Sequence, residues 1–135
     1  MIKNNFSYTL IVSENDIDRL NHVNNITYLQ WVQIVAQKHW NFLSNTDVDD
    51  KYVWVVIRHE IDYFSPAMLH DEIIVTTYIG DSYGVKSERY VEIKKGDKIL
   101  AKAKTIWCLL DKNTMKPVKV PAEIMMILQS KKGNN

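Results

Sequence analysis

The sequence of 135 residues lacks the marks of several large functional classes. It has a single cysteine, Cys108, which excludes an internal disulfide and a multi-cysteine metal site. Its four glycines do not form the G-x-G-x-x-G or G-x-x-x-x-G-K patterns of common nucleotide-binding loops. The apolar runs 53–57 and 124–128 are far shorter than the ~20 residues that span a bilayer. We therefore expect no cofactor, no metal ion and no membrane span.

The charges are almost balanced, with 17 Lys and Arg against 16 Asp and Glu and a formal net charge of +1. Bulk electrostatics therefore recruits neither nucleic acid nor an acidic membrane, and we expect neither as a partner. The segment from Met1 to Ser7 lacks the apolar core of a secretion signal, which makes a cytoplasmic protein the expectation. The length predicts one domain over residues 1–135, with 131–135 as a frayed tail.

A long helix is predicted from Val23 to about Leu43, where apolar residues recur every three or four positions. Asn24 is its candidate N-cap, because a short amide side chain accepts hydrogen bonds from the unpaired N–H groups of a first turn. Further apolar residues beside the main stripe widen the apolar surface, so the helix should be enveloped. The main stripe consists of Val23, Ile26, Leu29, Val32, Val35, Ala36, Trp40 and Leu43.

Most of the remaining chain alternates with the period of two that is typical of β-strands. Turn residues at Gly80–Gly84 and Lys95–Asp97 predict antiparallel hairpins, and a short helix with Pro121 in its first turn closes the chain. We predict an α+β fold in which a curved antiparallel β-sheet wraps one long central helix. The strands are expected at 6–12, 52–64, 73–79, 85–93 and 99–110. In the last strand we expect Ile99, Ala101, Ala103, Thr105, Trp107 and Leu109 to face inward, and Lys102 and Lys104 outward.

The junction before the long helix reads N-D-I-D-R-L-N-H-V-N-N-I-T-Y-L-Q-W over residues 15–31. This segment resembles the D-x-D-x-x-G-H-V-N-N-x-x-Y-L signature of hotdog-fold thioesterases, the group of 4-hydroxybenzoyl-CoA, short acyl-CoA and plant acyl-ACP thioesterases. The segment 61–67 followed by Asp71 is similar to the Y-x-x-P-A-x-x-G-D pattern of the same family, and Val120-Pro121 matches before the last helix. The signature is matched at Asp16, Asp18, His22, Val23, Asn24, Asn25, Tyr28 and Leu29.

The resemblance implies thioester hydrolysis in fatty acid metabolism, with a catalytic carboxylate at Asp18 that acts as general base or nucleophile. The backbone N–H of Asn25 would donate to the oxyanion. These roles suit the chemistry, because a thioester needs a base or nucleophile and donors at the carbonyl, and a helix start supplies unpaired N–H groups. His22 either transfers protons or positions the loop, and the side chains of Asn24 and Tyr28 are candidate substrate contacts. Each polar residue here also suits a loop or cap role alone.

Basic residues on the predicted strands are candidate contacts for CoA phosphates or for the acidic face of a carrier protein. Among them we single out Arg58 and Arg89 as substrate-binding candidates. The alternative is that they belong, with Lys86, Lys102 and Lys104, to a row of exposed and solvated charges. Cys108 is expected to pack on the last strand.

Two positions depart from the family pattern. Asn21 and His70 stand where many members have glycine, and Asn tolerates the left-handed backbone conformation better than other non-glycine residues. The predicted helix also contains no Asp or Glu, with Gln30, Gln33 and Gln37 instead. This excludes the subgroup that uses a helix carboxylate as base and leaves Asp18 as the principal candidate.

The leading hypothesis is therefore a thioesterase that hydrolyses acyl-CoA or acyl-ACP. A non-catalytic hotdog acyl-CoA-binding or regulatory module is the alternative, since it would keep the fold without needing the carboxylate of Asp18. A hotdog hydratase or dehydratase would use a different motif. We expect a homodimer or a homotetramer of paired dimers, because relatives form sites between subunits and an unprotected sheet edge rich in Trp, Val and Tyr seeks a partner.

Overall fold

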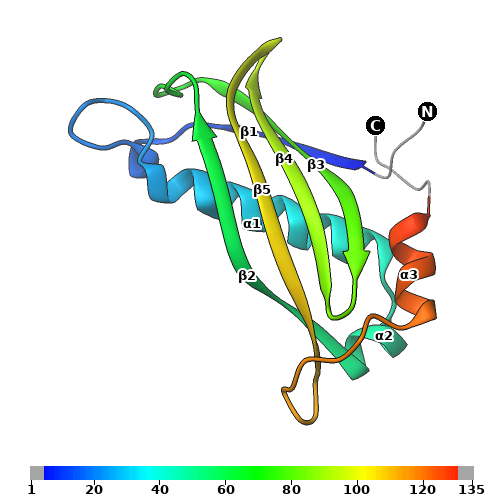
Figure 1. Cartoon of the computed structure of the whole chain (residues 1–135). Helices are drawn as coiled ribbons and strands as arrows, with labels where there is room; N and C mark the ends of the chain where they lie inside the picture. The colour runs from blue at the N-terminus through cyan, green and yellow to red at the C-terminus, as the bar shows by residue number, and fades with distance from the viewer. Residues whose placement is uncertain (1–4, 131–135) are drawn as a thin grey trace.

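The computed structural model describes residues 5–130, so the expected frayed tail at 131–135 lies outside the described residues. The predicted order of strand, long helix, four strands and closing helix is confirmed (Figure 1). Within residues 5–130, no helix combines the length and hydropathy of a membrane span. The elements are β1 (Asn5–Ile11), a 3-10 turn (Glu14–Asp16), α1 (Asn25–Leu43), α2 (Thr46–Lys51), β2 (Tyr52–Tyr63), β3 (Glu72–Tyr83), β4 (Lys86–Lys95), β5 (Lys98–Asp111) and α3 (Ala122–Gln129).

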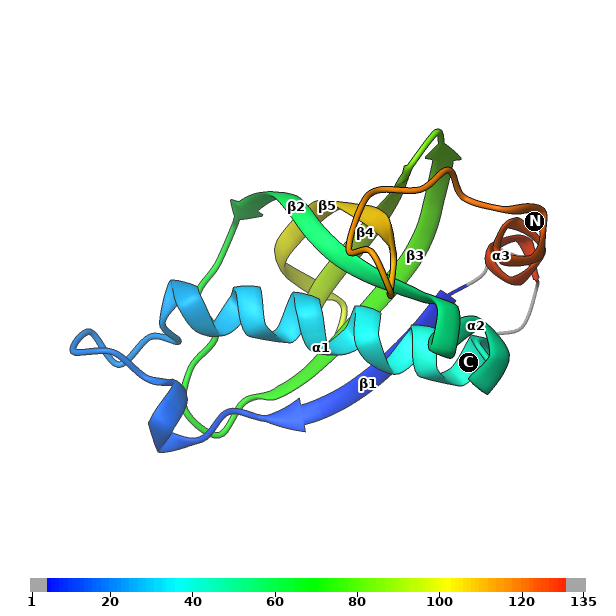
Figure 2. The same ribbon diagram turned by 90° about the horizontal axis from the view of Figure 1, so that it is seen from below.

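The five strands form one antiparallel sheet in the order β1-β3-β4-β5-β2. The sheet curves around α1, which lies along its inner side between β1 and β2 (Figure 2). Core residues of α1 and of the sheet, among them Val32, Val35, Val75 and Ala101, are buried together in one cluster. The expected α+β fold with a wrapped central helix is thus confirmed.

The long helix begins where the N-cap was predicted. The side chain of Asn24 accepts a hydrogen bond from the Ile26 N–H at 3.0 Å, and the helical conformation starts at Asn25. One member of the predicted apolar stripe is wrong, since Ile26 is 64% exposed. At about 100° per residue, Ile26 lies on the opposite side of the helix from Val35, which is fully buried.

The turn predicted at Gly80–Gly84 is also wrong in part, because β3 continues to Tyr83 and the chain reverses only at Gly84. Gly80 lies inside the strand for a packing reason. A Cβ atom at Gly80 would lie 2.7 Å from the Tyr90 ring, so only glycine allows this close approach. The second predicted hairpin is confirmed, with Gly96 in the left-handed region between β4 and β5.

Three smaller differences come from local irregularities. The register shifts where β4 pairs with β5, and Leu100 is fully buried next to Ala101 whereas the predicted inward residue Ile99 is only half-buried. Pro121 is the N-cap of α3 and precedes its first turn. The short helix α2 was not predicted, since its six residues are too few to show a helical period.

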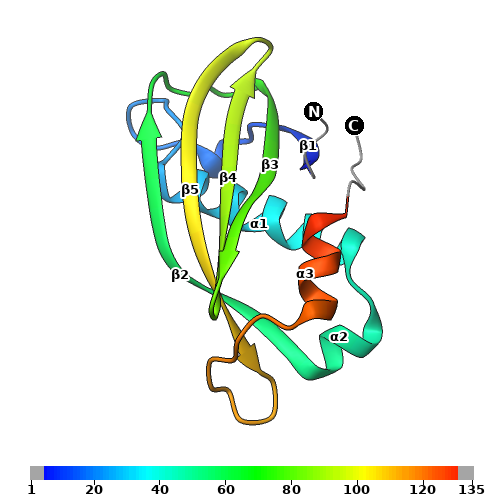
Figure 3. The same cartoon turned by 45° about the vertical axis from the view of Figure 1, so that its right-hand side comes forward.

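Helices α2 and α3 close the end of the molecule where α1 terminates. Figure 3 shows α3 beside α2 at this end of the sheet. A second buried cluster joins the two short helices to β5 through Val48, Leu109, Ile124 and Leu128. This end is therefore held by its own packing, and the opposite end, where α1 begins, carries the family signature.

Candidate active site

The signature segment folds into a small hairpin before α1. Ile17 pairs with Val23 as an isolated β-bridge, and the Asp18 N–H donates to the carbonyl of His22 at 2.9 Å. The turn at its tip requires a left-handed residue, and Asn21 has a φ of 62°. The expectation that Asn21 tolerates the left-handed conformation at this glycine position is confirmed.

Asp18 is exposed in this hairpin, and only one of its carboxylate oxygens is engaged. Its Oδ1 accepts hydrogen bonds from the backbone N–H groups of Leu20 at 2.8 Å and His22 at 3.4 Å. Within residues 5–130, Oδ2 accepts no hydrogen bond. The hairpin thus fixes the carboxylate through one oxygen and leaves the other available to a ligand.

The neighbouring carboxylate, Asp16, organises the loop. Its Oδ2 accepts hydrogen bonds from the N–H of Ser13 at 2.9 Å and from the Ser13 hydroxyl at 3.2 Å. Its carbonyl accepts from the Asn24 N–H at 2.8 Å and so ties the loop to the start of α1. These contacts engage Asp16 in the loop, in contrast to the free oxygen of Asp18.

The first turn of α1 leaves one backbone donor free. The side chain of Asn24 takes the Ile26 N–H, and the carbonyl of Asn24 takes the Thr27 N–H at 2.9 Å. The Asn25 N–H donates to no other group in the described part of the chain. It lies at the positive end of the helix dipole, where an anion is stabilised.

The opposite wall is the loop after β2, which is anchored to α1. The buried hydroxyl of Tyr28 accepts a hydrogen bond from the Ala67 N–H at 2.8 Å, and Val23 N–H donates to the Ala67 carbonyl at 3.0 Å. Burial raises the pKa of Tyr28, so its hydroxyl stays protonated. Tyr28 is therefore a wall and anchor residue whose hydroxyl is already engaged by the backbone.

The same loop ends in a second left-handed residue, His70, with a φ of 72°. Asp71 follows, and its carboxylate accepts from the Met68 N–H at 2.9 Å and pairs with Lys95 at 2.8 Å. Burial opposes the charge of Asp71, but these hydrogen bonds outweigh it and lower its pKa. The Asp71 carboxylate thus stabilises the turn in which His70 stands at the family's glycine position.

The two loops and the start of α1 enclose a hollow of about 440 Å³. It brings together the predicted site residues Asp18, His22, Asn24, Asn25 and Tyr28. The end of β2 and the loop after it form the other wall, and no role in the site was predicted for these residues from the sequence. Their similarity to the Y-x-x-P-A pattern of the family could have indicated that role. That wall consists of Tyr63, Phe64, Ser65 and Pro66.

The two predicted arginine contacts do not line this hollow. Arg58 is exposed on β2 and pairs with Glu60. For Arg89, the alternative of an exposed and solvated charge is wrong, because this residue is buried at 7% exposure. It lies in β4 on the inward face with Ser87 and Val91, by the alternation of the strand. Cys108 packs in β5 as expected and is buried.

Comparisons of the fold return many hotdog-type thioesterase structures. A predicted thioesterase from Bacillus stearothermophilus aligns with a TM-score of 0.83 at 21% identity, over 92% of this chain and 93% of that one. A 1,4-dihydroxy-2-naphthoyl-CoA thioesterase from Synechocystis aligns with a TM-score of 0.80 at 19% identity, over 93% and 96%. A Thermus thermophilus thioesterase complexed with coenzyme A and zinc has a TM-score of 0.81 at 22% identity, over 92% and 97%.

At the level of sequence, no curated protein matches the chain. A family model does: that of the acyl-ACP thioesterase N-terminal domain matches residues 3–128. The resemblance in the signature segment is thereby confirmed. Because this match covers nearly all of the 135 residues, the chain belongs to the acyl-ACP thioesterase family and is a hydrolase of the hotdog-fold acyl-CoA and acyl-ACP thioesterases.

Proposed function

We propose that the chain hydrolyses an acyl-CoA or acyl-ACP thioester to the free acid and the thiol in the hollow beside Asp18. One observation carries the proposal: Asp18, which has an unengaged carboxylate oxygen, and Asn25, which has an unengaged backbone N–H, line the same hollow. The first is a base or nucleophile, and the second is an oxyanion donor. Two similar structures, from Thermus thermophilus and Staphylococcus aureus, are complexes with coenzyme A, which supports a CoA carrier.

In this mechanism the thioester carbonyl oxygen accepts a hydrogen bond from the Asn25 N–H. Asp18 Oδ2 takes a proton from water as the water oxygen attacks the carbonyl carbon, and negative charge develops on the carbonyl oxygen. When the C–S bond breaks, the thiolate takes that proton back from Asp18. In the nucleophilic form, Oδ2 itself attacks the carbonyl carbon and the C–S bond breaks to release the thiolate. Water then cleaves the resulting anhydride, which regenerates Asp18 and frees the acid, and the proton released converts the thiolate to the thiol.

The remaining site residues hold this pair in place. The backbone N–H of His22 donates to the Asp18 carboxylate, and His22 is one of the residues that line the hollow. Asn24 caps the helix that presents the Asn25 N–H, and Tyr28 fixes the opposite wall through Ala67. These residues therefore act by positioning, and their loss should lower turnover less than loss of Asp18.

We also propose that two copies of the chain associate through the edge strand β2. Ile57 is 51% exposed and Tyr63 is 44% exposed on this strand, which bounds the sheet and ends beside the hollow. The unpaired edge of this strand is a template for a second copy. Arg58 would then lie in the interface region, where it could reach a ligand of the partner. Sedimentation at micromolar concentration should give a dimer or tetramer, and a species of ~16 kDa alone would contradict the association.

The test of the catalytic proposal is Asp18→Asn, assayed by thiol release from acyl-CoA and acyl-ACP substrates of graded chain length. General-base contributions are typically ~10² to 10⁴-fold, so kcat should fall by that range with little change in KM. Asp16→Asn is the control and should lower kcat less than Asp18→Asn does, because the Asp16 carboxylate is already hydrogen-bonded within the loop. Wild-type turnover by folded Asp18→Asn would remove Asp18 from the mechanism. Binding of acyl-CoA without any hydrolysis by the wild type would favour the non-catalytic module.

A further inference from the structure

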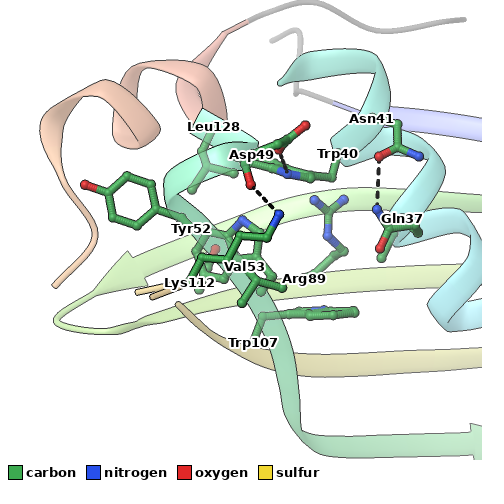
Figure 4. A pocket seen from close by; sticks show the side chains of 13 residues that line it. Gln37, Trp40, Asn41, Asp49, Tyr52, Val53, Arg89, Trp107, Lys112 and Leu128 are labelled. Carbon is green, nitrogen blue, oxygen red and sulfur yellow. Dashed lines mark hydrogen bonds between the residues drawn. The ribbon is translucent and has the colours of Figure 1, made fainter. Parts of the chain in front are cut away.

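A second cavity lies at the other end of α1, between that helix and the sheet. Its volume is about 230 Å³, and its walls are formed by residues of α1, β2, β4 and β5, with Asp49 of α2, Leu128 of α3 and Lys112 (Figure 4). Trp40 of α1 lies about 15 residues after Asn25, which places it ~22 Å further along the helix axis. This cavity is therefore separate from the hollow of Asp18 in the same chain.

A buried cation is among the residues that line this cavity. Arg89 is 7% exposed, and within residues 5–130 it forms no ion pair. Its Nη1 donates to His39 Nδ1 at 2.8 Å and to Thr77 Oγ1 at 3.2 Å, and both acceptors are neutral. Burial lowers the pKa of Arg89 to about 10, so the guanidinium stays charged at neutral pH.

The other half of the Arg89 guanidinium is unengaged. Within the described residues, Nε and Nη2 make no hydrogen bond, and Figure 4 shows the side chain among the residues that line the cavity. A buried charge of this kind is costly unless an anion or further hydrogen bonds satisfy it. Arginine presents paired N–H groups that match the two oxygens of a carboxylate.

The walls around Arg89 are aromatic. Trp40, Trp54 and Trp107 all line the cavity, and the rings of Trp40 and Trp54 meet edge to face with centroids 5.9 Å apart. A ligand that fits must therefore combine an apolar or aromatic body with its negative charge. The cavity is smaller than the ~300–1,000 Å³ of drug-sized sites, which favours a ligand of about one ring.

The other charged groups of the cavity do not neutralise Arg89. Asp49 accepts hydrogen bonds from Trp40 Nε1 at 3.1 Å and from the Ser44 hydroxyl, so its carboxylate is already engaged. Lys112 is exposed and donates to the Asp49 carbonyl at 3.0 Å. An incoming anion would thus meet the buried cation Arg89 and the exposed cation Lys112, together with the Asp49 carboxylate, whose hydrogen bonds from Trp40 and Ser44 hold it in place.

We infer that this cavity binds a small organic carboxylate with an aromatic body, whose carboxylate pairs with the free edge of Arg89. The ligand is a free acid, because the ~22 Å along α1 between this cavity and the hollow of Asp18 is beyond the reach of an acyl group of about one ring. The site goes beyond the proposed hydrolysis, since binding of a free acid requires neither Asp18 nor turnover.

Tryptophan fluorescence gives a direct binding assay, because three of the four tryptophans line the cavity. The probe is benzoate, and benzamide is the neutral compound of matched shape. Benzoate should produce a saturable change in emission, and benzamide should bind at least ~10-fold more weakly, a difference of about 1.4 kcal/mol. Equal binding of the two compounds, or no saturable change with benzoate, would overturn the inference.

Two variants locate the binding. Arg89→Gln removes the charge, and Ser87→Leu adds bulk to the cavity wall on the same face of β4 without changing Arg89. Both should weaken benzoate binding at least tenfold, whereas Val55→Phe, in β2 and outside the cavity lining, should not. If Arg89→Gln does not fold, the Ser87 and Val55 variants decide the question. Wild-type affinity in folded Arg89→Gln, or in folded Ser87→Leu, would refute the site.

Thioester hydrolysis provides a control. Because the cavity is too far from Asp18 for an acyl group of one ring, the CoA thioesters of an aromatic dicarboxylic acid and of the matching monocarboxylic acid should be hydrolysed with similar kcat/KM. A higher kcat/KM for the dicarboxylic substrate that Ser87→Leu abolishes would refute a site separate from the hollow of Asp18. A failure of hydrolysis itself leaves the fluorescence test intact.

Discussion

Replacement of Asn25 by proline removes the proposed oxyanion donor and nothing else from the backbone. Asn25 is the first residue of α1, where proline is favoured because its fixed φ suits a helix start. Asn24 has φ −61° and ψ 138°, the extended conformation that a residue before proline adopts. Helix α1 should therefore begin at the same residue in Asn25→Pro.

The magnitudes of the two effects follow from the hydrogen bonds around this N–H. Because the Asn25 N–H has no acceptor in residues 5–130, its removal breaks no bond, and the free energy of unfolding should change by no more than about 0.5 kcal/mol. Loss of one oxyanion donor typically lowers kcat by ~10² to 10³-fold, about 2.7–4 kcal/mol in the transition state. The kinetic effect should thus far exceed the effect on stability.

The matched control is Asn25→Ala, which removes the side chain and keeps the N–H. Thiol release gives kcat and KM for both variants, and urea denaturation gives their stability. We expect Asn25→Ala to keep nearly wild-type kcat and Asn25→Pro to lose it at unchanged KM. Wild-type kcat in folded Asn25→Pro would refute the oxyanion role of this N–H. An equal loss in both variants would transfer the role to the side chain.

Buried groups outside the reacting atoms lead to three further expectations. Tyr28→Phe leaves the Ala67 N–H without its acceptor and should lower the free energy of unfolding by about 1–3 kcal/mol in urea denaturation. Burial, with a smaller effect from Arg89, lowers the pKa of His39 to about 3 in the folded chain. Below pH 6.5, the ordinary pKa of histidine, His39 therefore binds a proton in the unfolded chain but not in the folded chain. The free energy of unfolding should therefore be highest above pH 6.5 and lower by about 2 kcal/mol at pH ~5. His39→Gln should remove this decline, and an unchanged decline in that variant would contradict the assignment to His39. The lowered pKa of Asp71 stabilises the fold above its ordinary pKa of 3.8, and this contribution is lost as the pH falls further, so Asp71→Asn should flatten the acid end of the stability curve.

Local features were predictable from the sequence, because a few neighbouring residues determine them. The N-cap at Asn24 depends only on a short amide placed before the first free N–H groups. The left-handed turns at Asn21 and His70 follow from the glycine positions of the family pattern. The same holds for Asp18 and Asn25, which lie on either side of one helix start and so meet in one hollow.

The tertiary structure alone decided the features that depend on residues far apart in the chain. Arg89 alternates with polar and apolar neighbours in β4, so its sequence context is equally compatible with an exposed charge; only the packing of α1 over that face buries it beside His39. Gly80 belongs to a segment with the composition of a turn, but it lies inside β3, where the Tyr90 ring on the neighbouring strand leaves no room for a Cβ atom. Such outcomes depend on the contact between a strand and the helix or strand that packs on it, and that contact forms only when the sheet curves around α1.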